Sequence, residues 1–433
     1  MSNESIIERR NRLLGAGAPL FYDEPVHIVR GEGVWLYDAD GKKYLDTYNN
    51  VPNVGHCHPH VVEALHRQSQ QLNVHTRYLH ELILEYVERL TATHDDSLDM
   101  AFITCSGTEA NELALRMARF ITGRQGIICT NATYHGNSEA VDELATLFRG
   151  SSTPTTRVET VSRRVKAVPY PEAYRPISGE TGEALANDYL DTVKQAIEEF
   201  EKEGVGLAGM LICPIFANEG LPDVPPTYME KAAQMVRDAG GVVIFDEVQS
   251  GFARTGTNMW GYQVSGVAPD IATMGKPMGN GHPLAGLVAG ADLVNEFRKE
   301  VMYFNTFGGN PVQCSVGMAV LDVIENENLQ ENCRVVGEYT RDGLRELAKK
   351  YELIGDVRGQ GLFTGVELVK DRATKEGATE EARKVINEMK ERGVLISKIG
   401  VYDNVLKLRP PLPYSKDNAD QLLSTLDDVL AEI

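Results

Sequence analysis

Lys276 stands in a glycine-rich stretch, residues 274–281 (MGKPMGNG), beside an apolar run. A lysine that acts as a nucleophile or forms an imine needs low polarity around its amine and backbone room for a ligand. Three glycines in eight residues provide that room. A lysine is otherwise a solvated surface residue, so this stretch predicts chemistry only together with other sites.

Asp246 closes an apolar run in residues 242–249 (VVIFDEVQ). If the run is a strand, Asp246 points to the carboxyl edge of the sheet, where open α/β sheets bind ligands. A carboxylate there could hold a cationic ring nitrogen; capping the next segment or binding Mg²⁺ are the alternatives. The chain has no G-x-x-x-x-G-K-[ST] sequence, which excludes a P-loop nucleotide enzyme.

Residues 104–111 (TCSGTEAN) lie where a strand-like run passes into a helical pattern. Ser106 and Glu109 have the spacing of a capping box. A helix N-terminus with a glycine and two hydroxyls offers backbone N–H groups to a phosphate. An ordinary helix cap is the alternative for this motif.

Arg409 ends the apolar run 405–409 just before two prolines. An arginine fixed in this way can bind a carboxylate through two parallel hydrogen bonds. A structural ion pair would explain the same residue equally well.

Two other patterns look functional but are better read as structure. Residues 55–60 (GHCHPH) lack the distant Cys/His pair that a tetrahedral metal site needs, so they predict a helix-start loop and no metal. Residues 359–365 (GQGLFTG) have their third glycine one residue late for a dinucleotide loop, and a strand follows them.

The elements that would position these residues alternate along the middle of the chain. Unbroken apolar runs indicate strands, and i, i+3, i+4 spacing indicates helices. The strand-like runs are 101–105, 127–130, 208–213, 242–245 and 284–289, and the helical stretches are 109–120 and 228–238. Strands without polar alternation, separated by helices, predict a mostly parallel sheet buried on both faces.

The rest of the chain predicts a smaller α+β domain. Its elements are a hairpin at 33–47, strands within 356–370, a helix at 377–392, strands at 394–398 and 405–409, and a helix at 415–432. The polar stretch 150–182 is expected to be an irregular surface insertion that could cover an active-site mouth. We therefore expect an N-terminal segment (1–60) that joins the small domain, a large domain (61–314) and a small domain (315–433).

Composition excludes several classes of function. The 433 residues carry 43 basic and 62 acidic side chains, a net charge of −19, with no basic run for nucleic acid. Six cysteines at irregular spacing favour reduced thiols over a disulfide framework. The first residues lack an apolar signal core, and the longest apolar run, 207–217, is too short for a membrane. We expect no membrane association and a cytoplasmic location.

In this order and spacing, the motifs resemble those of the class III (ornithine/ω-type) aminotransferases of pyridoxal-phosphate (PLP) fold type I. The matching pieces are SGTEAN (106–111), YHG (134–136), FDEVQSGFARTG (245–256), MGKPMGNGHPLAG (274–286), NTFGGNP (305–311) and RGQGLF (358–363). VGHCHP (54–59), MGNGHPLAG (278–286) and GVELVKDR (365–372) look most like the branch that contains ethanolamine-phosphate phospholyase and related aminotransferases.

The resemblance implies an α/β fold, PLP as cofactor and a role for each matching residue. Lys276 would carry PLP as a Schiff base, and Asp246 would pair with its ring nitrogen. The other implied cofactor ligands are Ser106, Gly107 and Thr108 at the phosphate, Tyr134 stacked on the ring with His135 beside it, Gln249 near the ring hydroxyl, and Thr306. Thr306 would come from the neighbouring subunit, which implies a homodimer with shared active sites, or a tetramer built from such dimers.

The substrate end departs from the family pattern. Arg409 matches the family arginine that binds a substrate carboxylate. Residues 213–220 (CPIFANEG) replace the common E-P-V-Q-G-E-G, so Glu219 takes the place of the second glutamate only with a shift of one residue. That glutamate can neutralise the arginine in relatives, so a switch between two substrates is in question.

Two reactions remain open on sequence alone. Transamination would pass the amino group of an amine or amino acid to a 2-oxo acid, and elimination would release phosphate from a phosphorylated amino alcohol such as phosphoethanolamine. Arg409 favours a substrate with a carboxylate, and hence transamination. A PLP-binding protein without catalysis is a further hypothesis, against which Lys276, Asp246 and Thr306 speak; a metal-dependent hydrolase is the remaining one.

Overall fold

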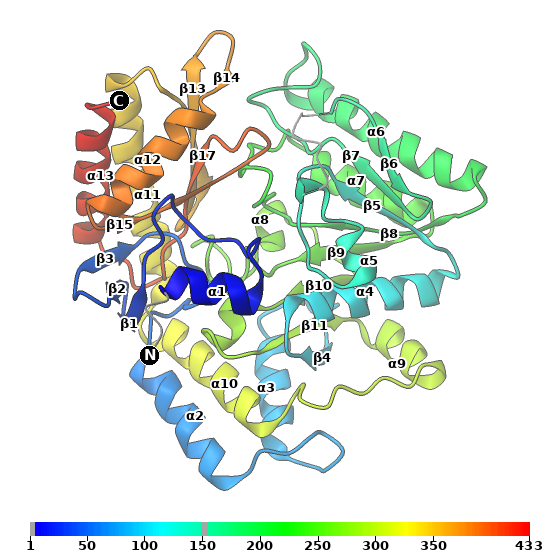
Figure 1. Cartoon of the computed structure of the whole chain (residues 1–433). Helices are drawn as coiled ribbons and strands as arrows, with labels where there is room; N and C mark the ends of the chain where they lie inside the picture. Colours follow the sequence, from blue (N-terminus) through cyan, green and yellow to red (C-terminus); the bar gives the residue numbers. More distant parts are fainter. Residues whose placement is uncertain (1–4, 149–154) are drawn as a thin grey trace.

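The computed structural model describes residues 5–148 and 155–433. An eight-stranded sheet forms its centre (Figure 1). In order across the sheet, the strands are β4 (Met100–Thr104), β11 (Ala285–Ala289), β10 (Ile271–Met274), β9 (Val242–Asp246), β8 (Leu207–Ile212), β5 (Gly126–Thr130), β7 (Val165–Val168) and β6 (Glu159–Ser162).

Both faces of this sheet are buried, as the unbroken apolar runs predicted. On β9, Val242 and Ile244 pack in one core cluster with residues of α4 (Gly107–Thr122) and α9 (Ala291–Glu300). The alternate residues Val243 and Phe245 belong to a second cluster with α6 (Gly182–Lys202) and α7 (Tyr228–Asp238). Successive side chains of a strand point to opposite faces, so helices cover the sheet on both sides.

Most of the sheet is parallel, and the antiparallel pairs involve β11 and the edge strand β6. β10, β9, β8, β5 and β7 pair in parallel, whereas β11 pairs antiparallel with both β10 and β4. The sequence predicted a mostly parallel sheet but gave no direction for the strand at residues 284–289. Only residues 275–284 join β10 to β11, and a parallel connection needs a longer crossover.

The carboxyl ends of β4 and of the parallel strands meet at one edge. β4 runs in the same direction as β10, because both are antiparallel to the strand between them. The ends of β4, β5, β8, β9 and β10 therefore share the edge at which α/β sheets bind ligands. Asp246 is the last residue of β9, and Lys276 follows the end of β10 by two residues.

Residues 150–182 were expected to be an irregular surface insertion, and this was wrong for residues 159–168. β6 and β7 extend the central sheet, and all four residues of β7 are buried. Polar residues on β6 and at the turn to β7 concealed the strands. Residues 150–154 lie outside the described part of the chain, and residues 169–181 form loop structure beside the C-terminal strands.

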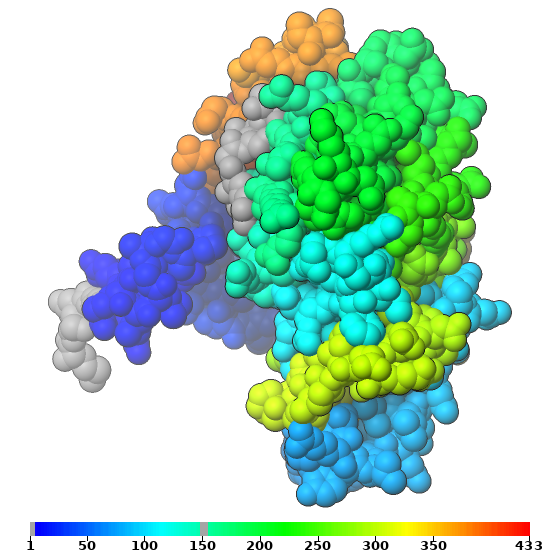
Figure 2. Space-filling model, turned by 90° about the vertical axis from the view of Figure 1, so that its right-hand side faces the viewer, coloured from blue at the N-terminus to red at the C-terminus, as the bar shows by residue number. Residues whose placement is uncertain are grey.

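The N-terminal hairpin was predicted correctly and forms part of a second sheet. That sheet contains β1 (Ile28–Glu32), β2 (Trp35–Asp38), β3 (Lys43–Asp46) and β15 (Val394–Leu395). Pairing of β3 with β15 joins the two ends of the chain. The short helix α1 (Ile6–Leu14) precedes it and buries none of its residues; Figure 2 shows this N-terminal segment standing away from the body of the molecule.

A third sheet carries the C-terminal site residue. Its strands are β12 (Ile354–Gln360), β13 (Phe363–Asp371), β17 (Val405–Leu408), β16 (Ser397–Ile399) and the short β14 (Glu376–Gly377). The single strand expected at 394–398 is in fact two, β15 and β16, in different sheets. Arg409 directly follows β17.

The remaining helices surround these sheets (Figure 1). They are α2 (Pro59–Gln71), α3 (Glu81–Thr91), α5 (Glu139–Asp142), α8 (Tyr262–Ser265), α10 (Pro311–Asn326), α11 (Leu329–Lys350), α12 (Thr379–Glu391) and α13 (Lys416–Leu430). α2 begins after residues 55–58, which confirms the predicted helix-start loop.

The domain boundary expected between residues 314 and 315 falls inside α10, and the division of the chain into three parts stays a prediction. No helix in the described chain has the length and apolarity to cross a membrane.

Candidate active site

A cavity of about 290 Å³ opens at the carboxyl edge of the central sheet. It brings together eight of the residues singled out from the sequence: Ser106, Gly107, Thr108, Tyr134, His135, Asp246, Gln249 and Lys276. A larger hollow of about 580 Å³, lined by residues 214–230 and 359–363 among others, contains none of them. The smaller cavity is therefore the candidate active site.

Lys276 enters this cavity from a strained backbone. Its φ is +33°, in a region that residues with a side chain rarely adopt, and such strain clusters at functional sites. A Cβ on Gly275 would lie 3.2 Å from the amide nitrogen of Gly107, so the lysine loop packs directly against the start of α4. The side chain is open to the cavity but enclosed by its walls. This enclosure lowers the pKa of Lys276, although the Asp246 carboxylate opposes the shift.

Asp246 is held as an ionised carboxylate. Burial alone would raise its pKa, but a hydrogen bond and the charge of His135, together with the charge of Lys276, lower it below the ordinary value. The Val248 amide donates to Oδ1 at 2.9 Å, and Asn111 Nδ2 donates to Oδ2 at 3.0 Å. A buried, ionised carboxylate of this kind favours a cationic partner in the cavity.

His135 supports Asp246 from the side away from solvent. Its Nδ1 lies 2.7 Å from Asp246 Oδ2, and its Nε2 lies 3.0 Å from Thr133 Oγ1. An ionised carboxylate only accepts, so the ring donates from Nδ1. Asn111 also donates to the His135 carbonyl and accepts from Thr273 Oγ1. Through these bonds β9, β10, α4 and the loop after β5 fix one carboxylate.

The start of α4 has the predicted capping box. Ser106 Oγ accepts from the Glu109 amide at 3.2 Å, and the Glu109 side chain accepts from the Ser106 amide at 3.0 Å. The first-turn N–H groups have no carbonyl partner within the helix and carry the positive end of its dipole. Gly107 and Thr108 border the cavity here, so this corner can accept a phosphate.

Gln249 connects the cavity to a group of buried cations. Its Nε2 donates to Asn218 Oδ1 at 3.0 Å, and Asn218 Nδ2 donates to the Tyr134 carbonyl at 3.1 Å. Its Oε1 accepts from Lys407 Nζ at 3.1 Å and from Arg409. The side chain that was expected near a ring hydroxyl is thus committed to three protein partners.

Lys407 and Arg409 are buried side by side, and in the described part of the chain neither is in ion-pair contact with an acid. Arg409 Nε also donates to the Tyr48 carbonyl, so its recorded acceptors are neutral. Among residues 5–148 and 155–433, no carboxylate forms an ion pair with either cation. Burial lowers the pKa of both residues, and the charge of Arg409 lowers that of Lys407 further. Two buried cations without an acid favour binding of an anion.

Glu219 does not lie against Arg409. Its Oε1 accepts from Thr130 Oγ1 at 2.6 Å and its Oε2 accepts from the Asn218 amide at 3.1 Å. Burial raises the pKa of this carboxyl group. If the family pattern E-P-V-Q-G-E-G is aligned without a gap from Cys213, its second glutamate aligns with Asn218, a neutral residue. The structure brings Glu219 close to the site but does not pair it with the arginine.

Thr306 lies outside the cavity of its own chain. It is exposed, in the loop between α9 and α10, next to the exposed Phe307. Phe304 of the same loop contacts His75, with ring centroids 5.7 Å apart. The loop that carries Thr306 and the residues after His75 expose several large apolar side chains; they include Tyr78, Leu79, Met302 and Phe307.

Three functional candidates were missed from the sequence. Lys407 could have been found, because strand alternation places residues 405, 407 and 409 on one face. Asn111 stood inside a recognised motif, but only the fold shows that it reaches Asp246. The link from Asn218 to Gln249 joins residues 31 apart and has no local sequence signal.

Comparison with known proteins finds similar chains along nearly the whole length of this one. The family described as aminotransferase class-III matches residues 21–430. The chain is 40% identical to the mitochondrial alanine–glyoxylate aminotransferase 2 homolog 2 of Arabidopsis thaliana, over 98% of this chain and 87% of that protein. It is 36% identical to ethanolamine-phosphate phospho-lyase homolog 1 of Caenorhabditis elegans, over 99% of this chain and 94% of the relative. A phospholyase from Arthrobacter, solved in complex with phosphoethanolamine, superimposes with a TM-score of 0.94 at 43% identity, covering 99% of this chain and all of the other.

Proposed function

The chain belongs to the class III aminotransferases, a pyridoxal-phosphate-dependent family, and from that premise we propose that it passes the amino group of an amine or amino acid to a 2-oxo acid, with Lys276 as the covalent anchor of the cofactor. The observation that carries the proposal is the meeting of Lys276 and Asp246 in one cavity. A strained, enclosed lysine and an ionised carboxylate are the two groups that such a cofactor needs.

The residues of the cavity fit pyridoxal phosphate. An aldehyde requires an amine that can lose its proton, and the pKa of Lys276 is lowered. A pyridinium nitrogen requires an anion, and Asp246 is held ionised. A phosphate requires N–H donors, which the start of α4 presents beside Gly107 and Thr108. Tyr134 borders the same cavity and supplies a ring for stacking.

What the cofactor supplies when bound is an electron-poor ring that accepts the electrons of a broken Cα–H bond. The protein residues decide what happens to the proton. Lys276 Nζ takes it from the substrate carbon and returns it, because this amine has a lowered pKa and reaches into the cavity. Asp246 Oδ2, bound by His135 and Asn111, keeps a positive charge on the ring nitrogen.

Arg409 and Lys407 form the substrate-anion end of the site in this proposal. Neither side chain lines the cavity that contains Lys276 and Asp246. Both donate hydrogen bonds to Gln249, which does line that cavity. A substrate carboxylate bound by Arg409 would place an amino acid or a 2-oxo acid with its reacting carbon toward Lys276.

Elimination of phosphate is a second candidate, favoured by the pairing of Lys407 with Arg409. A phosphate dianion carries more charge than a carboxylate and suits two neighbouring cations that form no ion pair with a carboxylate in the described part of the chain. Asn218, where relatives carry a neutralising glutamate, leaves that charge in place during the whole reaction. Relatives named phospho-lyase and phospholyase match almost the full length of the chain.

One experiment separates the two candidates. The purified protein is given alanine with and without 2-oxoglutarate, and phosphoethanolamine with and without pyruvate or 2-oxoglutarate, and phosphate, ammonia and new amino acid are assayed together. Transamination requires the oxo acid and releases no phosphate. Elimination releases phosphate and ammonia without it. Cofactor binding without turnover of either substrate would contradict both and favour a binding protein.

We also propose a homodimer in which Thr306 of each subunit completes the other's phosphate site. Thr306 does not line the cavity of its own chain, and exposed apolar residues of its loop would be covered by a second copy. A cytoplasmic location remains our expectation, although one relative is named as mitochondrial.

A further inference from the structure

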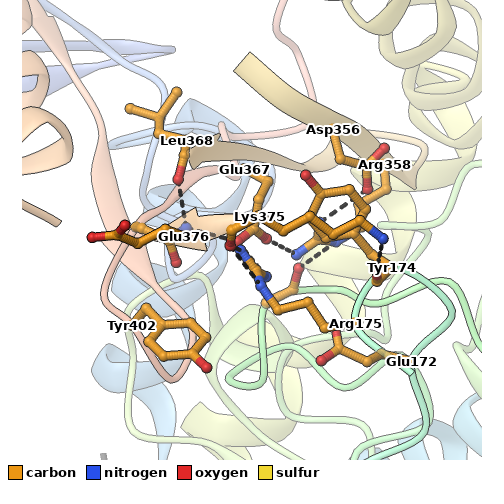
Figure 3. Close-up of polar contacts among 12 residues, drawn as sticks. Glu172, Tyr174, Arg175, Asp356, Arg358, Glu367, Leu368, Lys375, Glu376 and Tyr402 are labelled. Atoms are coloured by element: carbon orange, nitrogen blue, oxygen red, sulfur yellow. Dashed lines mark hydrogen bonds and ion pairs between the residues drawn. The ribbon is translucent and has the colours of Figure 1, made fainter. Parts of the chain in front are cut away.

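A buried network of charges joins the loop after β7 to the C-terminal sheet. Figure 3 shows Arg175, Arg358 and Glu367 converging between the strand ribbons and the loop that carries Tyr174. Arg358 and Glu367 are 4% and 1% exposed, and Arg358 NH2 lies 2.6 Å from Glu367 Oε2. The second carboxylate oxygen pairs with Arg175 NH1 at 2.6 Å and accepts from Asn404 Nδ2 at 2.7 Å.

Such a network is weak support for stability, because desolvation offsets much of the attraction between buried charges. Its geometry suggests a different role. Arg358 uses NH1 for Asp356 and NH2 for Glu367, and with Nε it donates to the Gly220 carbonyl at 2.9 Å. This third bond leaves the network and reaches the turn that follows β8.

The turn after β8 needs an external anchor. Within residues 213–221, Phe216, Gly220 and Leu221 have positive φ values of 48°, 108° and 57°. Residues other than glycine persist in this region only where surrounding structure holds them. Asn218, which binds Gln249 at the active site, lies between these strained residues.

The same turn packs on the strand pair that presents the two buried cations. A Cβ on Gly365 would lie 3.2 Å from the Gly220 carbonyl oxygen. Gly365 pairs with Lys407 in the register of β13 and β17. Arg358 therefore holds the Asn218 turn against the strand of Lys407, and Gln249 bridges the two.

We propose that Arg358 is a positioning residue for the substrate-anion end of the active site. By fixing the Gly220 carbonyl against β13, it sets the spacing between Asn218 and Lys407, and hence the place of the Gln249 amide oxygen. The inference rests on the proposed anion-binding role of Lys407 and Arg409. Lys276 follows β10 and Asp246 ends β9, so the backbone positions of the anchoring lysine and of the ring-nitrogen carboxylate do not depend on this contact.

The test compares Arg358→Met/Glu367→Met with Arg175→Met, all as holoenzymes. The double variant removes both buried charges and the Gly220 contact. Arg175→Met removes one network cation but leaves the Gly220 contact intact. The affinity for inorganic phosphate is measured by calorimetry, with KM and kcat for phosphoethanolamine and the cofactor absorbance spectrum.

In the double variant we expect phosphate affinity to fall, and KM for phosphoethanolamine to rise, by at least about tenfold. Displaced binding groups weaken binding with little change in kcat. Arg175→Met should stay within about threefold of the parent in all of these values. The cofactor spectrum should be the same in all three proteins. An unchanged phosphate affinity in the double variant, or an equal loss in Arg175→Met, would overturn the proposal.

Arg358→Lys provides a second test of the positioning role if the double variant does not fold. Lysine keeps a charge for Glu367 but has no planar fork to reach Gly220 as well, so phosphate affinity should still fall. Full affinity in Arg358→Lys counts against the positioning role. If the proposed function is wrong, the result differs: the parent protein turns over no amine. The phosphate affinity would still be lower in the Arg358 variants than in Arg175→Met.

Discussion

His135 Nδ1 lies 2.7 Å from Asp246 Oδ2, and both side chains are buried. This contact lowers the pKa of Asp246 against the effect of burial. The carboxylate therefore stays charged over the neutral pH range without an arginine beside it. A negative charge at the end of β9 is the part of the site that a ring cation would require.

Asp246→Asn should leave the fold intact and reduce kcat for the best amine by at least about a hundredfold, since a preorganised charge is lost from the reacting group. The amide keeps the size of the side chain. Stopped-flow kinetics and the cofactor absorbance of the variant measure the effect. A variant with parental kcat would show that Asp246 serves the structure only.

Lys407→Met should raise KM for phosphoethanolamine by about tenfold or more, because a charged hydrogen bond contributes about 1.5–3 kcal/mol. KM for alanine should rise less, since Arg409 alone suits a carboxylate. Leu406→Met, on the opposite face of β17, is the matched control. Equal changes for both substrates would mean that Lys407 does not discriminate between the two anions.

Shared active sites predict complementation between two inactive variants. Lys276→Ala lacks the anchoring lysine, and Thr306→Trp blocks the contribution to the partner. Mixed and re-associated, the two should recover about a quarter of the parental activity, because half of the dimers then contain one intact site. Activity that stays at zero, with mixed dimers demonstrated by mass spectrometry, would place Thr306 outside the catalytic unit.

The charge network predicts a pH dependence of stability. Burial raises the pKa of Glu172 to about 7, against the charges of Arg358 and Arg175. The folded state binds this proton more tightly than the unfolded state, so the contribution of Glu172 is fully present below its unfolded pKa and is lost as pH rises toward 7. Relative to Glu172→Gln, the free energy of unfolding should fall by about 3 kcal/mol between pH 4.5 and 8. Urea unfolding at both pH values measures it, and parallel pH profiles of the two proteins would contradict the prediction.

The sequence predicted those parts of the fold and site that depend on local pattern. The run VVIFD predicted β9 and its terminal carboxylate, and S-x-x-E at 106–109 predicted the cap of α4. Strand direction is not local: residues 284–289 are as apolar as any parallel strand, yet β11 is antiparallel because its connection is short. β7 was missed because the polar sequence around it outweighed four buried residues.

Contacts between distant segments set the limit for the site. Lys407 reaches Gln249 across 158 residues, and Arg358 reaches Gly220 across 138. A motif identifies Gln249 but does not say which of its neighbours bind it. Glu219 bonds Thr130 and does not pair with Arg409. This position depends on a strained turn, and no pattern in the sequence predicted the φ values of that turn.

The central claim is a covalent bond between Lys276 and the cofactor. Borohydride reduction of the holoenzyme, followed by proteolysis and mass spectrometry, tests it most directly. We expect the mass of the reduced cofactor on the peptide that contains Lys276, and its complete absence in Lys276→Ala. Label on any other lysine of the parent protein, or a variant that keeps both the bound cofactor's absorbance and amine turnover, would contradict the account.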